Sequence, residues 1–486
     1  MYIIANPLVY NYLPTTNALN NAADSIPSLV SIDIDSVVRS VTPDIGAYEF
    51  TVGTLDAKID WVNPMGAQTA GNKTVRVKIT NTSIDPITSL ILNYTDGTTV
   101  YTDTFPSVAL LTGDTLIANF TNQYNVTAPV SFRGFITSVN GGLDFVRGND
   151  TTTWQDVCIA MAAGTYTINS ALPDTGSNFS SFNNAVTAMS CGITGPVIFN
   201  VAPGSGPYTE QVDIPFIPGS SAINTITING NNNELIFAGG NATNWATLNL
   251  NGTDHLTVKN LVITGTALTN CFGVHLMGNA TYNTFDSCTI SVPITPIVTT
   301  VIGVSISGSK ILYSTTGINA SNNLFNRCTV NGGYYAMSFY GYTTIDTNNR
   351  NNSITNCIVR DAYAYGIYNI YQGYSTISNN IIERPNRTNS TTTGGVILST
   401  NCANILVEKN RVRNLFGAFP GSTSAAYGLY CSSSAASSGF ENKFINNVVS
   451  DIKSNGTIYA IYTLSSVYVQ IYHNTINLDD QTATAG

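Results

Sequence analysis

A six-residue pattern of hydrophobic and polar positions recurs from about residue 256 onward. It consists of an apolar residue, two variable residues, Asn or Cys, a variable residue and an apolar residue that is usually β-branched. A second pattern, a small residue followed by apolar residues, falls between successive copies. Both keep an average spacing of about 30 residues, which is typical of a solenoid. The six-residue copies begin at Phe285, Phe325, Ile354, Ile377, Val407, Phe444 and Ile471, and the small residues are Gly273, Gly303, Ala336, Gly366, Gly395, Gly428 and Ala460.

These repeats predict strands, because the apolar runs are short, rich in β-branched residues and separated by Asn, Gly and Ser, without a helical period. A repeat of about 30 residues with several short strands is typical of a parallel β-helix. Its coils stack at the strand spacing of ~4.8 Å. Equivalent positions of successive coils then form columns along the axis.

The fourth position of the six-residue pattern forms one such column. Stacked Asn side chains in it are expected to bond amide to amide, and Cys fits the same place as a small buried residue. Parallel Cβ vectors are a poor geometry for a disulfide, so the three cysteines are expected to be free thiols. A bridge between Cys158 and Cys191 stays open. After a looser first copy at Leu261, the predicted ladder is Cys288, Cys328, Cys357, Asn380, Asn410, Asn447 and Asn474.

Three regions are predicted. Residues 156–486 form the β-helix, with a capping helix at about 178–190 whose N-cap is Asn178 or Ser180. Residues 56–155 lose the period and show alternating runs at 8–12-residue spacing, which favours an immunoglobulin-like β-sandwich. Residues 1–55 form short extended runs. The fold class is therefore all-β.

Composition narrows the classes of function. Charged residues make up only 10% of the 486, the formal net charge is −9, and Asn, Ser, Thr and Gly take the place of charges. This argues against a coiled coil, a disordered acidic tail and a nucleic-acid-binding protein. No apolar run is long enough for a membrane span, and the first residues lack the features of a signal peptide. No zinc-ligand spacing occurs among eight Cys and three His, so no cofactor or metal is expected; calcium has no supporting motif.

Catalysis is not expected either. Glycoside hydrolysis needs two carboxylates about 5–9.5 Å apart. Asp361 and Asp451 share a column position but lie three coils apart, about 14 Å by the strand spacing. Glu383 and Glu408 occupy different columns. His255, His275 and His473 are expected at the surface or in turns. The sequence predicts no catalytic residue, although loops can bring distant groups together.

A binding face is the competing prediction. In the strand that carries the small residue, the side chain two positions beyond it should point outward. This outward column contains three tyrosines, Tyr368, Tyr430 and Tyr462, which are candidates for stacking on sugars or on another protein. The alternative is that Tyr simply suits exposed strand positions. The other members of the column are His275, Ser305, Ser338 and Ile397.

The ladder residues, together with Gly164-Thr-Tyr-Thr-Ile and Gly206-Pro-Tyr-Thr-Glu-Gln-Val, resemble the pectin-lyase-like β-helix regions of large secreted surface proteins of Bacteroidota. Asp44-Ile-Gly-Ala-Tyr-Glu-Phe50 resembles the segment that closes such β-helices, so residues 1–55 are interpreted as the end of a preceding β-helix. The resemblance implies type IX export and action at the cell surface.

We therefore expect a structural and adhesive segment of a large extracellular fibre or surface adhesin, not an enzyme. Its expected partners are adjacent repeats of the same polypeptide or further copies, assembled in tandem or head to tail, and surface glycans or cells. The alternative is a β-helix that binds or degrades polysaccharides as a lyase or glycosidase.

Overall fold

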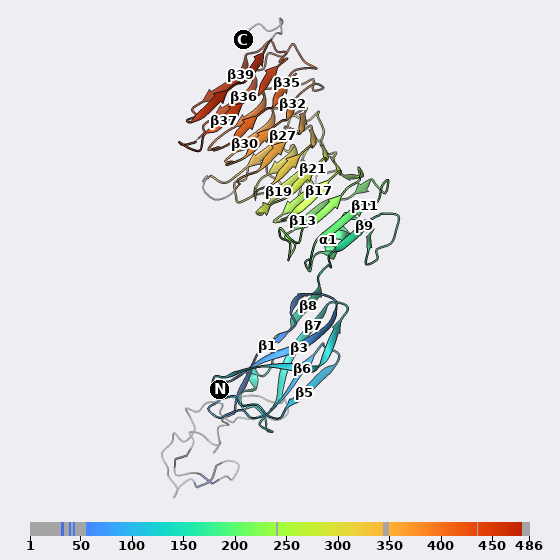
Figure 1. Cartoon of the computed structure of the whole chain (residues 1–486), viewed down its shortest axis with the longest axis vertical. Helices are drawn as coiled ribbons and strands as arrows, with labels where there is room; N and C mark the ends of the chain where they lie inside the picture. The colour runs from blue at the N-terminus through green and yellow to red at the C-terminus, as the bar shows by residue number, and fades with distance from the viewer. Residues whose placement is uncertain are drawn as a thin grey trace. The chain divides into compact units, whose positions relative to one another are not determined.

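The computed structural model describes residues 31–33, 38–39, 42–43, 55–239, 242–343, 349–434 and 436–478. It divides into two compact units, residues 1–160 and 161–486 (Figure 1). Most of the predicted closing segment, including Asp44–Phe50, lies outside the described residues. The described part of both units is almost entirely β-structure.

The first unit contains two sheets built around an apolar core that includes Val77, Leu92 and Phe132. One sheet has the antiparallel order β1-β3-β6, and the other has the order β2-β8-β7-β4-β5, in which only the β2-β8 pair is parallel. The immunoglobulin-type topology stays a prediction. The last strand ends at Ile159, so the change of unit follows Ala160 rather than residue 155. The strands are β1 (Ala57–Asn63), β2 (Gly66–Gln68), β3 (Gly71–Asn81), β4 (Leu90–Thr95), β5 (Val100–Phe105), β6 (Thr115–Val126), β7 (Val130–Val139) and β8 (Gln155–Ile159), with a 3-10 turn η2 (Arg147–Asn149).

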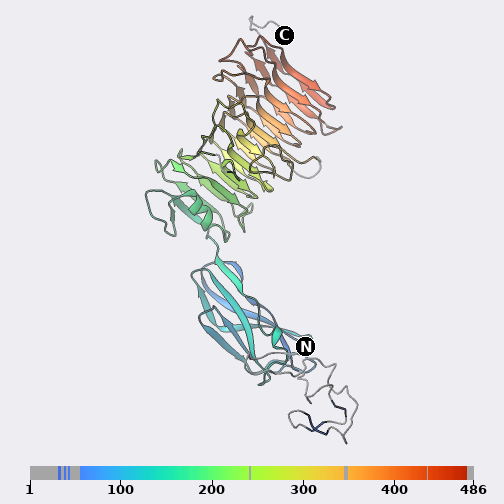
Figure 2. The ribbon, with the colours of Figure 1, turned by 180° about the vertical axis from the view of Figure 1, so that it is seen from behind.

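The second unit is a β-helix whose coils each add one strand to three parallel sheets (Figures 1 and 2). The first sheet contains β10 (Asn178–Phe179), β9 (Gly164–Ile168), β11 (Val197–Val201), β14 (Ile226–Asn229), β17 (Leu256–Lys259), β21 (Thr284–Asp286), β25 (Leu324–Asn326), β28 (Ser353–Thr355), β31 (Thr376–Ser378), β34 (Leu406–Glu408), β37 (Asn442–Ile445) and β40 (Val469–Tyr472). The second contains β12 (Tyr208–Thr209), β15 (Glu234–Phe237), β18 (Val262–Gly265), β22 (Thr289–Ser291), β26 (Thr329–Asn331), β29 (Ile358–Arg360), β32 (Ile381–Glu383), β35 (Arg411–Arg413), β38 (Val448–Ser450) and β41 (Thr475–Asn477). The third contains β13 (Val212–Pro215), β16 (Ala246–Asn251), β19 (Cys271–Met277), β23 (Val301–Ile306), β27 (Tyr335–Tyr340), β30 (Tyr365–Ile370), β33 (Thr393–Leu398), β36 (Ala426–Ser432) and β39 (Ile458–Leu464). A short pair, β20 (Ala280–Thr281) and β24 (Ala320–Ser321), lies in a turn.

The two sequence patterns correspond to two faces of one core. In the copies from Phe285 to Val449, the first apolar position and the β-branched sixth position are buried in the core from the first and second sheets, as Phe325 and Val330 are with 0% exposure. The small residues lie on the third sheet opposite the β-branched residues. A Cβ on Gly273 would lie 2.7 Å from Cγ2 of Ile290, so the interior leaves no room for a larger side chain there.

A single left-handed residue makes the bend between the first and second strands of a coil. It is the third position of the six-residue pattern, and its φ is close to +55° in coil after coil. L-residues rarely adopt this conformation, and Asn tolerates it better than most. This explains why the position is often Asn. Its members are Asn260, Ser287, Arg327, Asn356, Asn379, Lys409, Asn446 and His473.

The predicted capping helix is present but shorter, α1 (Phe182–Ala188). The predicted N-cap was wrong: Oγ of Ser181, not a group of Asn178 or Ser180, accepts the Asn184 N–H at 3.0 Å. The chain is not yet helical at the earlier positions, because Asn178 belongs to β10. Phe182 and Ala185 are buried against the first coils.

Candidate functional site

The ladder turn is a continuous row of buried amides over four coils. Nδ2 of Asn380, Asn410 and Asn447 each donates to Oδ1 of the next Asn along the column, at 2.9, 3.0 and 2.9 Å. The same oxygens also accept a backbone N–H from the preceding ladder residue at 2.9–3.0 Å. Each amide therefore joins two coils, and Asn474 ends the described row.

The three cysteines continue this row with the same directions of bonding. Sγ of Cys357 accepts the backbone N–H of Cys328 at 3.4 Å and donates to the Phe325 carbonyl oxygen at 3.4 Å. Cys288, Cys328 and Cys357 are all free and buried. The hydrogen bond with Cys328 and burial raise the pKa of Cys288 above that of an ordinary thiol.

A second column of buried amides, which the sequence analysis missed, lies just before the first strand of the coils. Nδ2 of Asn283 donates to Oδ1 of Asn323 at 3.0 Å, and Nδ2 of Asn323 donates to Oδ1 of Asn352 at 3.0 Å. The row ends on Oε1 of Gln372, 3.1 Å from Nδ2 of Asn352. The signal was present in the sequence, since each Asn stands two residues before the first apolar position.

The outward column of the third sheet is largely covered, contrary to the prediction. His275, Ser305 and Ser338 are 0% exposed and Ile397 is 2% exposed. The prediction that His275 lies at the surface was also wrong: its Nδ1 lies 2.8 Å from Asn249 Oδ1 and its Nε2 lies 3.0 Å from Ser307 Oγ. Burial lowers its pKa to about 3, so the imidazole is neutral at physiological pH.

A chain segment after β23 lies over this part of the sheet. Lys310 forms an ion pair with Asp213, and its backbone carbonyl oxygen accepts the backbone N–H of Trp245 at 3.1 Å. The ring of Tyr313 lies 5.4 Å from that of Tyr335. These contacts bury the outer face of the third sheet in its early coils and exclude it as a ligand face there.

Tyr368 is the first of the three predicted ligand-face residues, and it belongs to a packed aromatic group. Its ring centroid lies 4.8 Å from Tyr335 and 5.1 Å from Tyr365. Burial raises the pKa of Tyr365 to about 12 and also raises that of Tyr368. Because Ile397 separates it from Tyr430 in the column, Tyr368 does not form one surface with the other two residues.

Tyr430 and Tyr462, by contrast, are joined by two tyrosines that the sequence analysis missed, Tyr427 and Tyr459. We call these four residues the tyrosine surface. Strand register places Tyr427 beside Tyr459 and Tyr430 beside Tyr462, on β36 and β39. The ring centroids of these pairs are 5.0 and 5.2 Å apart, and Tyr427 and Tyr430 are 4.8 Å apart. All four side chains are half-buried.

The tyrosine surface combines apolar ring area with unused hydrogen-bonding groups. Across the described parts of the chain, none of its four hydroxyl groups has a hydrogen-bond partner within the protein. In the preceding coil, the residue paired with Tyr427 is Gly394, which has no ring to extend the row of Tyr427 and Tyr459. The arrangement is two rings wide and two coils long, and Tyr rings with free hydroxyls contact both apolar faces and hydroxyl groups of a ligand.

The carboxylates of the β-helix that lie in its described ranges are bound to protein groups. Glu383 lies 3.0 Å from Arg360 and 3.1 Å from Arg413. Asp361 accepts the Asn386 backbone N–H at 2.8 Å, and Asp286 pairs with Arg327. No group of three His, Cys, Asp or Glu side chains in the described ranges is placed to hold a metal ion.

In comparison with known proteins, residues 296–476 match a family model described as a right handed beta helix region. No curated protein matches the chain. The chain is also similar to three solved structures with TM-scores below 0.5, which carry no information on its activity. These are the Pseudomonas phage phi297 tailspike gp61 (9% identity, 78% of this chain and 63% of that one, TM-score 0.29), the Azotobacter vinelandii mannuronan C-5 epimerase AlgE6 A-module (10%, 65% and 90%, 0.25) and the catalytic domain of a GH87 alpha-1,3-glucanase in complex with tetrasaccharides (11%, 86% and 96%, 0.19).

Proposed function

We propose that this chain is an adhesive segment of an extracellular protein, in which the β-helix is a stiff support that presents the tyrosine surface to glycans. The observation that carries the proposal is the group of four adjoining tyrosines with unpartnered hydroxyls on β36 and β39. Aromatic rings at strand spacing offer a flat apolar face to a sugar ring, and their hydroxyls bond to sugar hydroxyls.

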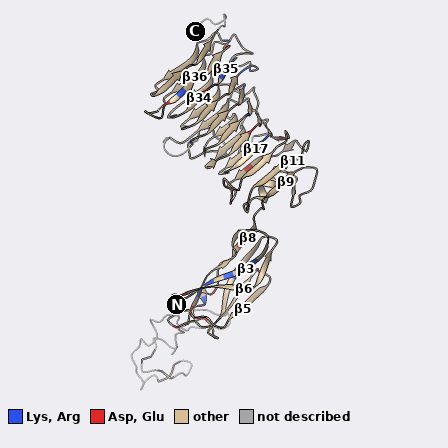
Figure 3. Ribbon diagram, viewed as in Figure 1, with Lys and Arg blue, Asp and Glu red and all other residues tan. Residues whose placement is uncertain are grey.

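The sparse charge supports binding to uncharged glycans. Lys, Arg, Asp and Glu are scattered over few positions in both units (Figure 3). Neutral sugars are bound chiefly through ring stacking and hydrogen bonds, which do not need a charged surface. No helix of the described chain is long and apolar enough to cross a membrane.

Glycan retention by matched variants tests this function. The double variant Tyr430→Ala, Tyr462→Ala should lose retention on an array of neutral oligosaccharides, because it removes one ring from each coil of the surface. Tyr342→Ala is the control, since Tyr342 is 42% exposed elsewhere on the β-helix. Unchanged retention by the double variant, with wild-type circular dichroism, would refute the proposal.

Assembly is part of the same proposal. The regular addition of one strand per sheet and coil supports tandem or head-to-tail stacking into fibres, because each coil pairs along its whole edge. Electron microscopy of native material from cells should show elongated particles with a repeat of one β-helix plus one sandwich. Discrete compact particles would contradict assembly but leave the glycan test unaffected.

A further inference from the structure

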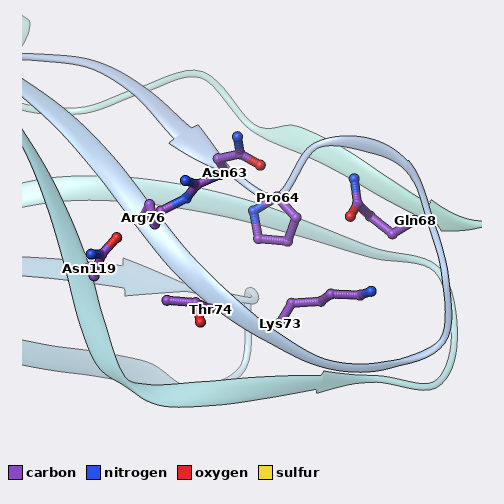
Figure 4. Close-up of a pocket in the computed structure, with 7 residues that line it drawn as sticks. All are labelled: Asn63, Pro64, Gln68, Lys73, Thr74, Arg76 and Asn119. Atoms are coloured by element: carbon purple, nitrogen blue, oxygen red, sulfur yellow. The ribbon is translucent and has the colours of Figure 1, made fainter.

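The outer face of the sheet β1-β3-β6 carries a row of polar side chains. Strand register places Asn63 beside Arg76 and Arg76 beside Asn119, so two amides flank one guanidinium across three strands. Figure 4 shows these side chains together with Lys73 and Gln68, which belong to the same depression. The row results from the alternation of side chains between the two faces of the sheet, because the neighbouring Val62, Val77 and Ala118 point into the core.

This depression is a polar pocket of about 460 Å³. Its side chains supply amide, hydroxyl, ammonium and guanidinium donors, and no carboxylate is among them. A pocket with two cations and three amides is suited to a ligand that carries both a negative charge and hydroxyl groups. It is lined by Asn63, Pro64, Gln68, Lys73, Thr74, Arg76 and Asn119.

Among the described residues, the cations of this pocket lack the carboxylate partner that neighbouring cations have. Lys58 and Lys78 both contact Asp60, at 3.0 and 3.5 Å. Within the described residues, Arg76 contacts no carboxylate, and Lys73 donates to the hydroxyl of Thr69 at 2.6 Å. Arg76 is exposed, so its planar pair of donors is available to an external carboxylate.

An aromatic ring lies on the same face beside the pocket. Trp61 precedes Asn63 by two residues, so both side chains point to the same side of β1, about 7 Å apart along the strand. Trp61 is half-buried, and its register partners across the sheet are Lys78 and then the exposed Ile117. The indole thus borders the row of Asn63, Arg76 and Asn119.

We propose that this pocket binds an acidic oligosaccharide, with the carboxylate of a hexuronic acid on Arg76, hydroxyl groups on the amides of Asn63 and Asn119, and a sugar ring on Trp61. A small inorganic anion would use the cations but neither the amides nor the indole. A nucleic acid would need a row of cations along its backbone, whereas this pocket supplies two, Lys73 and Arg76. The site lies in the first unit and does not depend on the tyrosine surface.

Titration calorimetry of the full chain tests the proposal, with hexagalacturonate as the probe and cellohexaose as its uncharged counterpart. Hexagalacturonate should bind, and its affinity should fall when NaCl is raised from about 0.05 M to about 0.5 M, because screening weakens exposed charge pairs. Arg76→Gln should weaken binding at least about tenfold, equivalent to about 1.4 kcal/mol. The control Lys58→Gln removes the same charge from a cation that is already paired, and should change affinity less than about twofold.

Trp61→Phe supplies a second readout. Hexagalacturonate should change the tryptophan fluorescence of the wild type and not that of the variant, although Trp154 and Trp245 remain. No binding of hexagalacturonate at millimolar concentration, or wild-type affinity in folded Arg76→Gln, would overturn the proposal. If Tyr430→Ala, Tyr462→Ala abolishes hexagalacturonate binding instead, the acidic sugar binds to the tyrosine surface and the pocket proposal fails.

Discussion

Replacing Asn410 by Ala should destabilise the β-helix locally by several kcal/mol. Asn410 is 0% exposed, and its side chain makes four hydrogen bonds. Its Nδ2 donates to Asn447 Oδ1 and to the Ile377 carbonyl oxygen at 2.8 Å, and its Oδ1 accepts the backbone and side-chain N–H groups of Asn380. Alanine would leave the buried Asn380 backbone N–H without this acceptor.

The expected cost follows from these bonds. An orphaned buried N–H costs about 1–3 kcal/mol, and each of the other lost hydrogen bonds contributes about 1 kcal/mol. The lost bond from Asn380 Nδ2 is not counted, because this group keeps its hydrogen bond to the Ile354 carbonyl oxygen at 2.9 Å. The expected loss in the free energy of unfolding is therefore about 3–5 kcal/mol. Asn410→Cys is the matched control: Cys357 in the same column retains one accepted and one donated hydrogen bond, so Cys should cost clearly less than Ala.

Hydrogen exchange measured by mass spectrometry, combined with urea unfolding of the full chain, checks this prediction. In Asn410→Ala, peptides that cover Asn380 and Asn447 should exchange faster by the factor that corresponds to the lost free energy, and peptides of the first unit should not change. If Asn410→Ala protects these peptides as well as the wild type does, or if Asn410→Cys is equally damaging, the hydrogen-bond argument is wrong.

Three further predictions concern burial. Burial, with the charge of Asp144, raises the pKa of Asp150 to about 7, so the native state holds a proton that the unfolded state releases. The free energy of unfolding of the first unit should therefore fall as pH rises from about 4 to 7. Urea unfolding at several pH values should show this fall, and the pH dependence should be weaker in Asp150→Asn. A thiol reagent should leave the six free cysteines unmodified in the native protein and react with all six in urea. All six are buried, and burial raises the pKa of Cys402 to about 12. Rapid labelling of the native protein would contradict this prediction. Gly273→Val should lower the thermal midpoint strongly, because its Cβ would lie 2.7 Å from Ile290, whereas Ala336→Gly should have a small effect.

The sequence predicted the β-helix because a strict period places chemically equal residues at equal positions of successive coils. The amides from Asn380 to Asn474 therefore stack as the period requires. The second amide column at Asn283 and Asn323 follows from the same period and was accessible to the same reasoning. The N-cap was harder, because three neighbouring polar residues are equally suited to the role and packing alone selects Ser181.

The ligand face was predicted less well, for a physical reason. The period describes only the strands, whereas the segments between them differ in length and sequence. Alternation correctly directs His275 away from the core, but the ion pair of Lys310 with Asp213, 97 residues apart in the chain, holds a non-repeating segment over it. Tyr430 and Tyr462 were predicted from the outward column. Tyr427 and Tyr459 were missed because the small residue that follows each of them shifts the inward and outward alternation of side chains along the strand by one position.

The pairing of the few charged residues distinguishes the two proposed sites. In a chain with only 10% charged residues, two of the described carboxylates each pair with two cations: Glu383 with Arg360 and Arg413, and Asp60 with Lys58 and Lys78. Arg76, exposed and without a carboxylate contact among the described residues, gains no ion-pair stabilisation on this face. Under the proposal, its place beside two amides and an indole suits an acidic sugar, which differs from the neutral sugars suited to the tyrosine surface.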